Sequence, residues 1–109
     1  METKNAITAL TALGHATRLA AFRLLVEAGP SGRMAGDIAA ALQVPPATLS
    51  FHLKELLQAG LVQSESQGRT VCYRARFDAM NGLIDYLTDN CCAASPAAQC
   101  APAPRPRRC

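Results

Sequence analysis

The 109 residues suffice for one domain with a modest hydrophobic core and do not suffice for two. No stretch approaches the roughly 18 consecutive apolar residues of a membrane span, and the N-terminus lacks the layout of a signal peptide. We therefore expect a cytoplasmic protein with no membrane partner. The formal net charge of +3 resides in three arginines of the C-terminal tail, because residues 1–90 hold eight basic and eight acidic residues. Net charge alone thus does not indicate nucleic-acid binding.

Helical periodicity of apolar residues marks the first half of the chain. It predicts helices at about 4–13 and 16–28, and the second ends where glycine and proline interrupt the pattern. A third, short helix is expected around 38–42. A fourth is expected from about Pro46 to Ala59, with a leucine stripe formed by Leu49, Leu53, Leu56 and Leu57. The third and fourth helices form a helix-turn-helix candidate.

Beyond the fourth helix the period changes to alternation, which is typical of strands. Residues 61–66 and 69–74 flank Gln67 and Gly68 and predict a two-stranded hairpin. A last helix is expected at about 78–90. Asp78 is its predicted N-cap, and its apolar face holds Met80, Leu83, Ile84 and Leu87.

The composition changes abruptly after the last predicted helix. Residues 91–109 hold four of the seven prolines and no large apolar residue, so they cannot pack a core. We therefore divide the chain into a folded domain at 1–90 and a flexible tail at 91–109.

Five segments resemble the ArsR/SmtB family of metalloregulators: Leu13–Leu19, Ala47–Leu56, Ala59–Val62, Gly68-Arg69 and Tyr73-Arg74. The resemblance spans about residues 10–92. It implies a mostly α-helical winged helix-turn-helix protein with a small β-hairpin, which forms a homodimer through its first and last helices. It also implies that two recognition helices enter successive major grooves of double-stranded operator DNA, while two wings touch the flanking backbone.

The fourth helix offers DNA the face opposite its leucine stripe, by an advance of about 100° per residue. Thr48 and Ser50 suit hydrogen bonds to base edges or phosphates, Lys54 suits a phosphate, and Phe51 suits thymine methyl groups. His52 lies at the edge of the stripe, so we expect it mainly to orient the helix and rank it last among the contacts. With two wing arginines, the predicted DNA-binding residues are Ala47, Thr48, Ser50, Phe51, His52, Lys54, Arg69 and Arg74.

The five cysteines indicate metal or redox chemistry, because thiols stay reduced in the cytoplasm. In the longest-known arsenic sensors of the family a Cys-x-Cys pair begins the third helix, but residues 32–37 contain no thiol. The chain has two histidines, so any site must be nearly all thiolate. The segment Leu87–Cys92 with Cys100 downstream resembles the members whose arsenite site is C-terminal, which implies As(III) as the inducer.

Arsenic(III) is soft and takes three thiolates in a pyramid, so three convergent cysteines satisfy it. Cys91 and Cys92 supply two sulfurs if the end of the helix unwinds, and a seven-residue loop brings Cys100 within reach. Cys109 is the rival third ligand, and Cys72 is expected to be structural. The predicted metal-binding residues are thus Cys91, Cys92 and Cys100. The chain is expected to be an arsenite-responsive repressor that leaves DNA when the metalloid binds.

Two other functions of the cysteines stay open. The same cysteines would serve a repressor that senses methylarsenite, Sb(III), another thiophilic metal or oxidants, and methylarsenite needs only Cys91 and Cys92. A small thiol enzyme is less favoured. The chain has no Cys-x-x-Cys motif and no histidine or aspartate placed to activate a nucleophile. We therefore expect no enzymatic activity.

Overall fold

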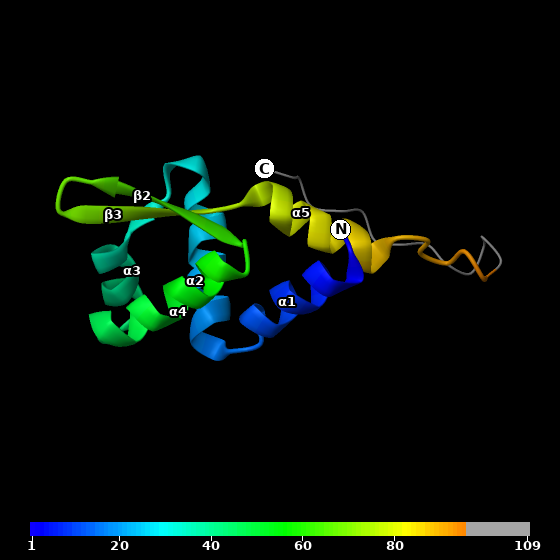
Figure 1. The fold of residues 1–109 in the computed structure, drawn as a ribbon, viewed down its shortest axis with the longest axis horizontal. Coiled ribbons are helices and arrows are strands. Elements are labelled where there is room, and N and C mark those ends of the chain that lie inside the picture. The colour runs from blue at the N-terminus through cyan, green and yellow to red at the C-terminus, as the bar shows by residue number, and fades with distance from the viewer. Residues whose placement is uncertain (96–109) are drawn as a thin grey trace.

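Helices and a small sheet alternate along residues 1–95, which are the residues that the computed structural model describes (Figure 1). The elements in chain order are α1 (Thr3–Leu13), α2 (Ala16–Ala28), the 3-10 turn η1 (Gly29–Ser31), β1 (Arg33–Met34), α3 (Ala35–Leu42), α4 (Pro46–Gln58), β2 (Val62–Gln67), β3 (Thr70–Ala75) and α5 (Phe77–Thr88). α3 and α4 form the helix-turn-helix, and β2 and β3 form the wing. The predicted winged helix-turn-helix fold is confirmed. No helix in this part of the chain is both long and apolar enough to cross a bilayer.

Local signals at the helix ends account for the boundaries. α2 begins after His15, whose Nδ1 accepts a hydrogen bond from the backbone N–H of Thr17 over 3.1 Å. The prediction that Asp78 caps the last helix is wrong. Phe77 packs against the core and is already helical, so Arg76 is the N-cap of α5 and Asp78 lies in its first turn.

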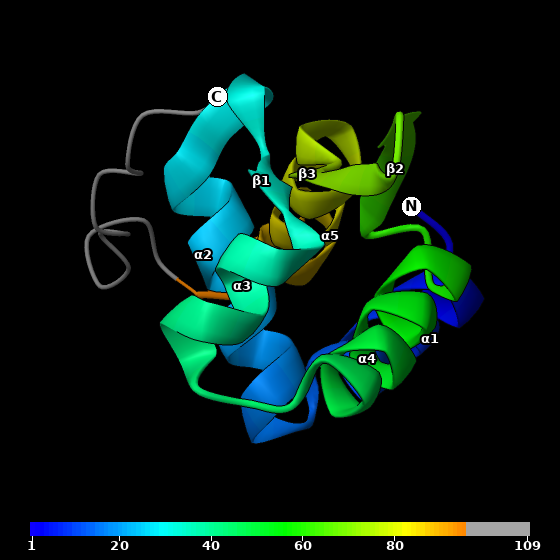
Figure 2. The ribbon, with the colours of Figure 1, turned by 90° about the vertical axis from the view of Figure 1, so that its left-hand side faces the viewer.

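The sheet has three antiparallel strands in the order β1-β3-β2, one more than the predicted hairpin (Figure 2). The prediction lacks β1 because two residues are too few to show an alternating pattern. Gly32 precedes β1 with φ +69°, and a Cβ at this position would overlap the carbonyl oxygen of Tyr73. Only glycine therefore lets the chain come so close to β3.

The core lies where α2, α3 and α4 meet the base of the wing. Its largest fully buried side chains are Leu25, Ile38, Leu49, Leu53, Leu56 and Leu61. Three of these belong to the predicted leucine stripe of α4, whose fourth member, Leu57, is half-buried. The stripe therefore fixes which face of α4 turns away from the core.

α1 and α5 lie side by side at the end of the molecule opposite the wing (Figure 1). A hydrogen bond of 2.5 Å between Thr3 Oγ1 and the Tyr86 hydroxyl joins them. The fully buried side chains of α1 are all small, namely Ala6, Ala9 and Ala12. Large apolar side chains of both helices stay exposed: Ile7 at 58%, Leu10 at 45%, Ile84 at 39% and Leu87 at 58%. One subunit therefore leaves an apolar surface uncovered on these two helices.

Candidate functional site

The outer face of α4 carries five of the side chains predicted to meet DNA. The exposed residues of this set are Ala47, Thr48, Ser50, Phe51 and Lys54. Phe51 has 56% of its surface exposed, although it is a large aromatic residue. Because a B-DNA major groove admits an α-helix, this face offers hydroxyl, ammonium and aromatic groups to base edges and phosphates.

His52 does not share that exposure. Its side chain is 7% exposed, and its Nδ1 accepts a hydrogen bond of 3.2 Å from the guanidinium of Arg18. Burial lowers the pKa of His52, and the neighbouring His15 and Arg18 lower it further, while Glu55 opposes the shift. The position agrees with the predicted orienting role. It speaks against a direct DNA contact, because the ring is packed between helices.

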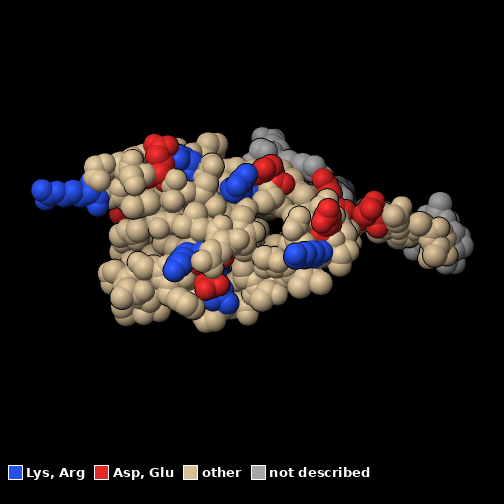
Figure 3. Space-filling view, viewed as in Figure 1, with Lys and Arg blue, Asp and Glu red and all other residues tan. Residues whose placement is uncertain are grey.

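The two wing arginines differ in their surroundings. The β2–β3 turn is Gly68-Arg69, one residue later than predicted, because Gln67 pairs with Thr70. Arg69 is therefore exposed at the tip of the wing. Figure 3 shows a basic side chain projecting from the end of the molecule where this turn lies. A cation in this place can reach the phosphates beside a groove.

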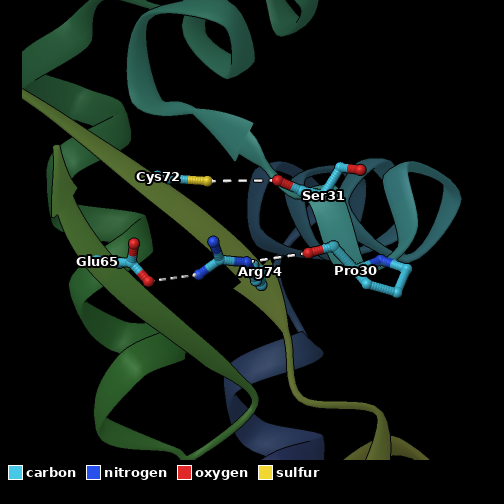
Figure 4. A network of polar contacts seen from close by, with 5 residues as sticks. All are labelled: Pro30, Ser31, Glu65, Cys72 and Arg74. Carbon is cyan, nitrogen blue, oxygen red and sulfur yellow. Dashed lines mark hydrogen bonds and ion pairs between the residues drawn. The ribbon is translucent and has the colours of Figure 1, made fainter.

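Arg74 faces the protein instead. Its Nε donates to the carbonyl oxygen of Pro30 over 2.9 Å, and its Nη1 lies 3.4 Å from Glu65 Oε2 (Figure 4). Next to it, the thiol of buried Cys72 lies 3.5 Å from the carbonyl oxygen of Ser31. These contacts hold Arg74 at the base of the wing. The sequence predicted Arg74 as a DNA contact and did not predict them. They also agree with the structural role expected of Cys72.

Cys91 and Cys92 lie in the turn just beyond the C-terminal end of α5. α5 ends at Thr88, two residues earlier than predicted, and Asn90 and Cys92 adopt positive φ of 58° and 63°. The Sγ atoms of Cys91 and Cys92 lie 3.6 Å apart. Around a tetrahedral zinc with Zn–S bonds of about 2.3 Å, two sulfurs lie about 3.8 Å apart. The separation of the two sulfurs in the turn is therefore similar to that of two sulfurs bound to one metal ion.

Cys91 and Cys92 differ in their surroundings. Cys91 is a free, exposed thiol, and Cys92 is half-buried and disulfide-bonded. Residues 1–95 contain no group of three or more histidine, cysteine or acidic side chains that could hold a metal ion. Cys100 and Cys109, the two predicted candidates for the third ligand, lie outside the described residues. A three-thiolate site thus needs a ligand from beyond residue 95 or from a second subunit.

Comparison with known proteins places this geometry in a family. A helix-turn-helix domain family matches residues 13–65. The structure is similar to that of an ArsR-like transcriptional regulator from Rhodococcus sp. RHA1, with 30% sequence identity and a TM-score of 0.64. The match covers 77% of this chain and 76% of that one. The chain belongs to the ArsR family.

Two further solved structures are similar to that of this chain. A homodimeric winged helix-turn-helix DNA-binding domain from Mycobacterium bovis shares 26% identity over 80% of this chain and 81% of that one, with a TM-score of 0.65. HlyU from Vibrio cholerae shares 26% identity over 84% of this chain and 99% of that one, with a TM-score of 0.67. No curated protein matches the chain significantly. The chain is therefore a transcriptional regulator with a helix-turn-helix DNA-binding fold.

The structure gives contacts to two residues that the sequence interpretation left without a role. Arg18 and His15 both belong to the segment Leu13–Leu19, on which the resemblance partly rests. In the structure both contact His52 of α4. Their place in a segment that resembles the family could have marked them as candidates. The spacing of residues along the chain does not predict that they contact α4.

Proposed function

We propose that this ArsR-family protein is a repressor that binds operator DNA as a homodimer and is released when As(III) is captured by Cys91, Cys92 and a third thiol. The separation of 3.6 Å between the Cys91 and Cys92 sulfurs carries the proposal. Cys92 adopts a positive φ of 63° in the turn that brings these sulfurs close. The third sulfur comes from Cys100 or Cys109.

The chemistry of capture balances without an oxidant or reductant. Arsenous acid carries three hydroxyl groups, and each exchanges for one thiol with release of one water. The product has three As–S bonds and no residual charge. Thiolate is preferred over imidazole or carboxylate because the ion is soft, and three-coordination separates it from tetrahedral zinc.

The exposed apolar surface supports a homodimer built on α1 and α5. Beside it, a cavity of about 360 Å³ opens between α2 and α5, and its apolar lining includes Leu19, Phe22 and Ile84. Leu19 is itself 44% exposed. Exposed large apolar side chains of this kind are typical of an interface, and the M. bovis neighbour is described as homodimeric.

The position of the thiol pair supports regulation through this interface. Cys91 follows α5 by one hydrogen-bonded turn, since its N–H donates to the carbonyl oxygen of Thr88, the last residue of the helix, over 3.0 Å. Capture of the tail by arsenic would therefore pull on the end of a helix in the proposed dimer interface. A hundredfold loss of operator affinity requires about 2.7 kcal/mol of coupling between the two sites.

Thiol counting on the reduced, full-length protein tests the site itself. Arsenite should protect three thiols per chain from a thiol reagent in the wild type and should leave Cys72→Ala equally protected. Cys100→Ser and Cys109→Ser separate the two candidates for the third ligand, because only the variant that lacks the ligand should lose protection. Full protection of the remaining thiols in Cys91→Ser/Cys92→Ser would contradict the proposed site.

Oxidant sensing is a second candidate function, and one observation favours it. Cys92 is disulfide-bonded in the structure. Formation of a disulfide removes two electrons and two protons from two thiols, and peroxide accepts them to give water. Peroxide should then release DNA and lower the mass of each chain by two hydrogen atoms, whereas arsenite should release DNA only from the reduced protein.

A further inference from the structure

One side chain bridges the interface helix α1 and the recognition helix α4. Arg18 lies in the first turn of α2, and its Nε donates to the carbonyl oxygen of Ala12 in α1 over 2.6 Å. A terminal nitrogen of the same guanidinium donates to Nδ1 of His52 in α4 over 3.2 Å. A groove of about 310 Å³ opens between α1 and α4, and Arg18 lines it. The guanidinium therefore connects two helices across a gap that apolar packing does not fill.

His15 is a second neighbour of His52, next to Arg18. Its ring centroid lies 4.4 Å from that of His52, with the planes tilted by 36°. Nδ1 of His15 accepts the N–H of Thr17 and caps α2. Since an arginine and a backbone N–H only donate, Nδ1 of both histidines must be unprotonated for these hydrogen bonds to exist.

We propose that Arg18 is a positioning residue for DNA recognition, which fixes the recognition helix α4 to α1 through Nδ1 of His52. Two hydrogen bonds from one planar guanidinium define both the distance and the angle between the helices. α4 then follows any movement of α1. The inference rests on DNA reading by α4 and does not require the arsenic site.

The link requires a neutral imidazole at His52, so it responds to pH. Burial lowers the pKa of His52, the neighbouring His15 and Arg18 lower it further, and Glu55 of α4 acts in the opposite direction. A proton on Nδ1 of His52 would remove the acceptor and place a cation against Arg18. Acid should therefore release α4 from α1 before it unfolds the domain.

The selectivity of DNA binding is the quantity to measure, because added positive charge raises affinity for every duplex. The probe is a duplex recovered by the wild-type, full-length protein from a random-sequence pool, with a scrambled duplex as reference. Arg18→Leu removes both hydrogen bonds and should lower the ratio of the two affinities about tenfold, the effect of roughly one mismatched base pair. Arg76→Leu removes the same charge from an ion pair with Asp78 and should keep the wild-type ratio.

Two further variants keep the test decisive if Arg18→Leu folds poorly. Arg18→Lys retains the charge and can reach one acceptor, so its ratio should lie between those of the wild type and Arg18→Leu. His15→Asn/His52→Asn keeps an acceptor near both Nδ1 positions, caps α2 and does not titrate. Its ratio should stay constant between about pH 7.5 and 5.5, while the wild-type ratio falls. A wild-type ratio in the Arg18 variants, or the same pH response in the double variant, would overturn the proposal.

Discussion

Arg74 of β3 donates a hydrogen bond from Nε to the carbonyl oxygen of Pro30 over 2.9 Å, which fastens the base of the wing to the turn after α2. Glu65 on the neighbouring strand lies 3.4 Å from the same guanidinium. Arg69 has a different position, at the exposed tip of the β2–β3 turn. Two arginines on one hairpin therefore differ in their surroundings: Arg74 contacts protein groups, and Arg69 is exposed.

Alanine substitutions test whether Arg69 contacts DNA and whether Arg74 stabilises the fold. Arg69→Ala should weaken binding to all duplex sequences and reduce the slope of log affinity against log salt by about 1, because one phosphate contact is lost. Arg74→Ala should instead lower the free energy of unfolding by about 1 kcal/mol, the usual net value of a partly exposed hydrogen bond. Salt-dependent binding titrations and urea unfolding measure the two effects. An unchanged affinity and slope in Arg69→Ala would remove the wing tip from the interface.

Phe51 tests the recognition face. Phe51→Ala should reduce the preference for thymine at one operator position, because the apolar contact with the methyl group is lost. Its effect on unfolding should stay within about 0.5 kcal/mol, since the ring is 56% exposed. Leu53→Ala on the buried face of α4 is the matched control and should cost about 2–5 kcal/mol. Binding of a library of singly substituted duplexes reports the preference, and a Phe51→Ala profile identical to the wild type would contradict the assignment.

Acidic pH should destabilise the domain through His52. The pKa of His52 is lowered in the folded protein, whereas an unfolded histidine titrates near about 6.5. The unfolded chain therefore binds the proton more readily. The stability contribution of the neutral ring is complete above about pH 6.5 and is lost as the pH falls below that value. Urea unfolding at a series of pH values should show a steeper loss in the wild type than in His52→Asn, and parallel curves would be evidence against this role.

Charge introduced on the apolar face of α1 and α5 should prevent dimer formation. Leu10 is 45% exposed and Leu87 is 58% exposed in one subunit, so Leu10→Glu and Leu87→Glu should fold as monomers. Burying an unpaired carboxylate in an interface is costly, and the loss of the dimer should also remove most of the affinity for a two-part operator. Phe51→Glu carries the same charge on α4 and should stay dimeric. Sedimentation velocity distinguishes these states.

The elements with strong local patterns could be predicted from the sequence, and those that depend on tertiary contacts could not. Leucines at helical spacing gave the correct buried face of α4, and Gly68 gave the hairpin turn to within one residue. β1 has two residues and exists because Gly32 lets the chain approach β3. The N-cap of α5 was misplaced because packing of Phe77 overrides the capping preference of Asp78.

The candidate site shows the same division. Exposure of Phe51 and Lys54 follows from helical periodicity, and the sequence contains that information. Arg74 differs from Arg69 because it contacts the carbonyl oxygen of Pro30, a residue more than forty positions away in the chain. The bridge from Arg18 to His52 likewise joins distant segments. The Cys91 and Cys92 sulfurs lie close together in a turn where Cys92 has a positive φ, which a non-glycine residue rarely adopts and which helical periodicity does not predict.

Release of DNA by arsenite from the reduced protein is the most direct test of the proposed switch. Wild-type protein bound to its selected duplex should lose affinity about a hundredfold when arsenite is added, which corresponds to about 2.7 kcal/mol of coupling. Cys91→Ser/Cys92→Ser should bind the same duplex and retain it in the presence of arsenite, because two of the three sulfurs are missing. Release of the double variant by arsenite at the wild-type concentration, or no release of the wild type, would contradict the account.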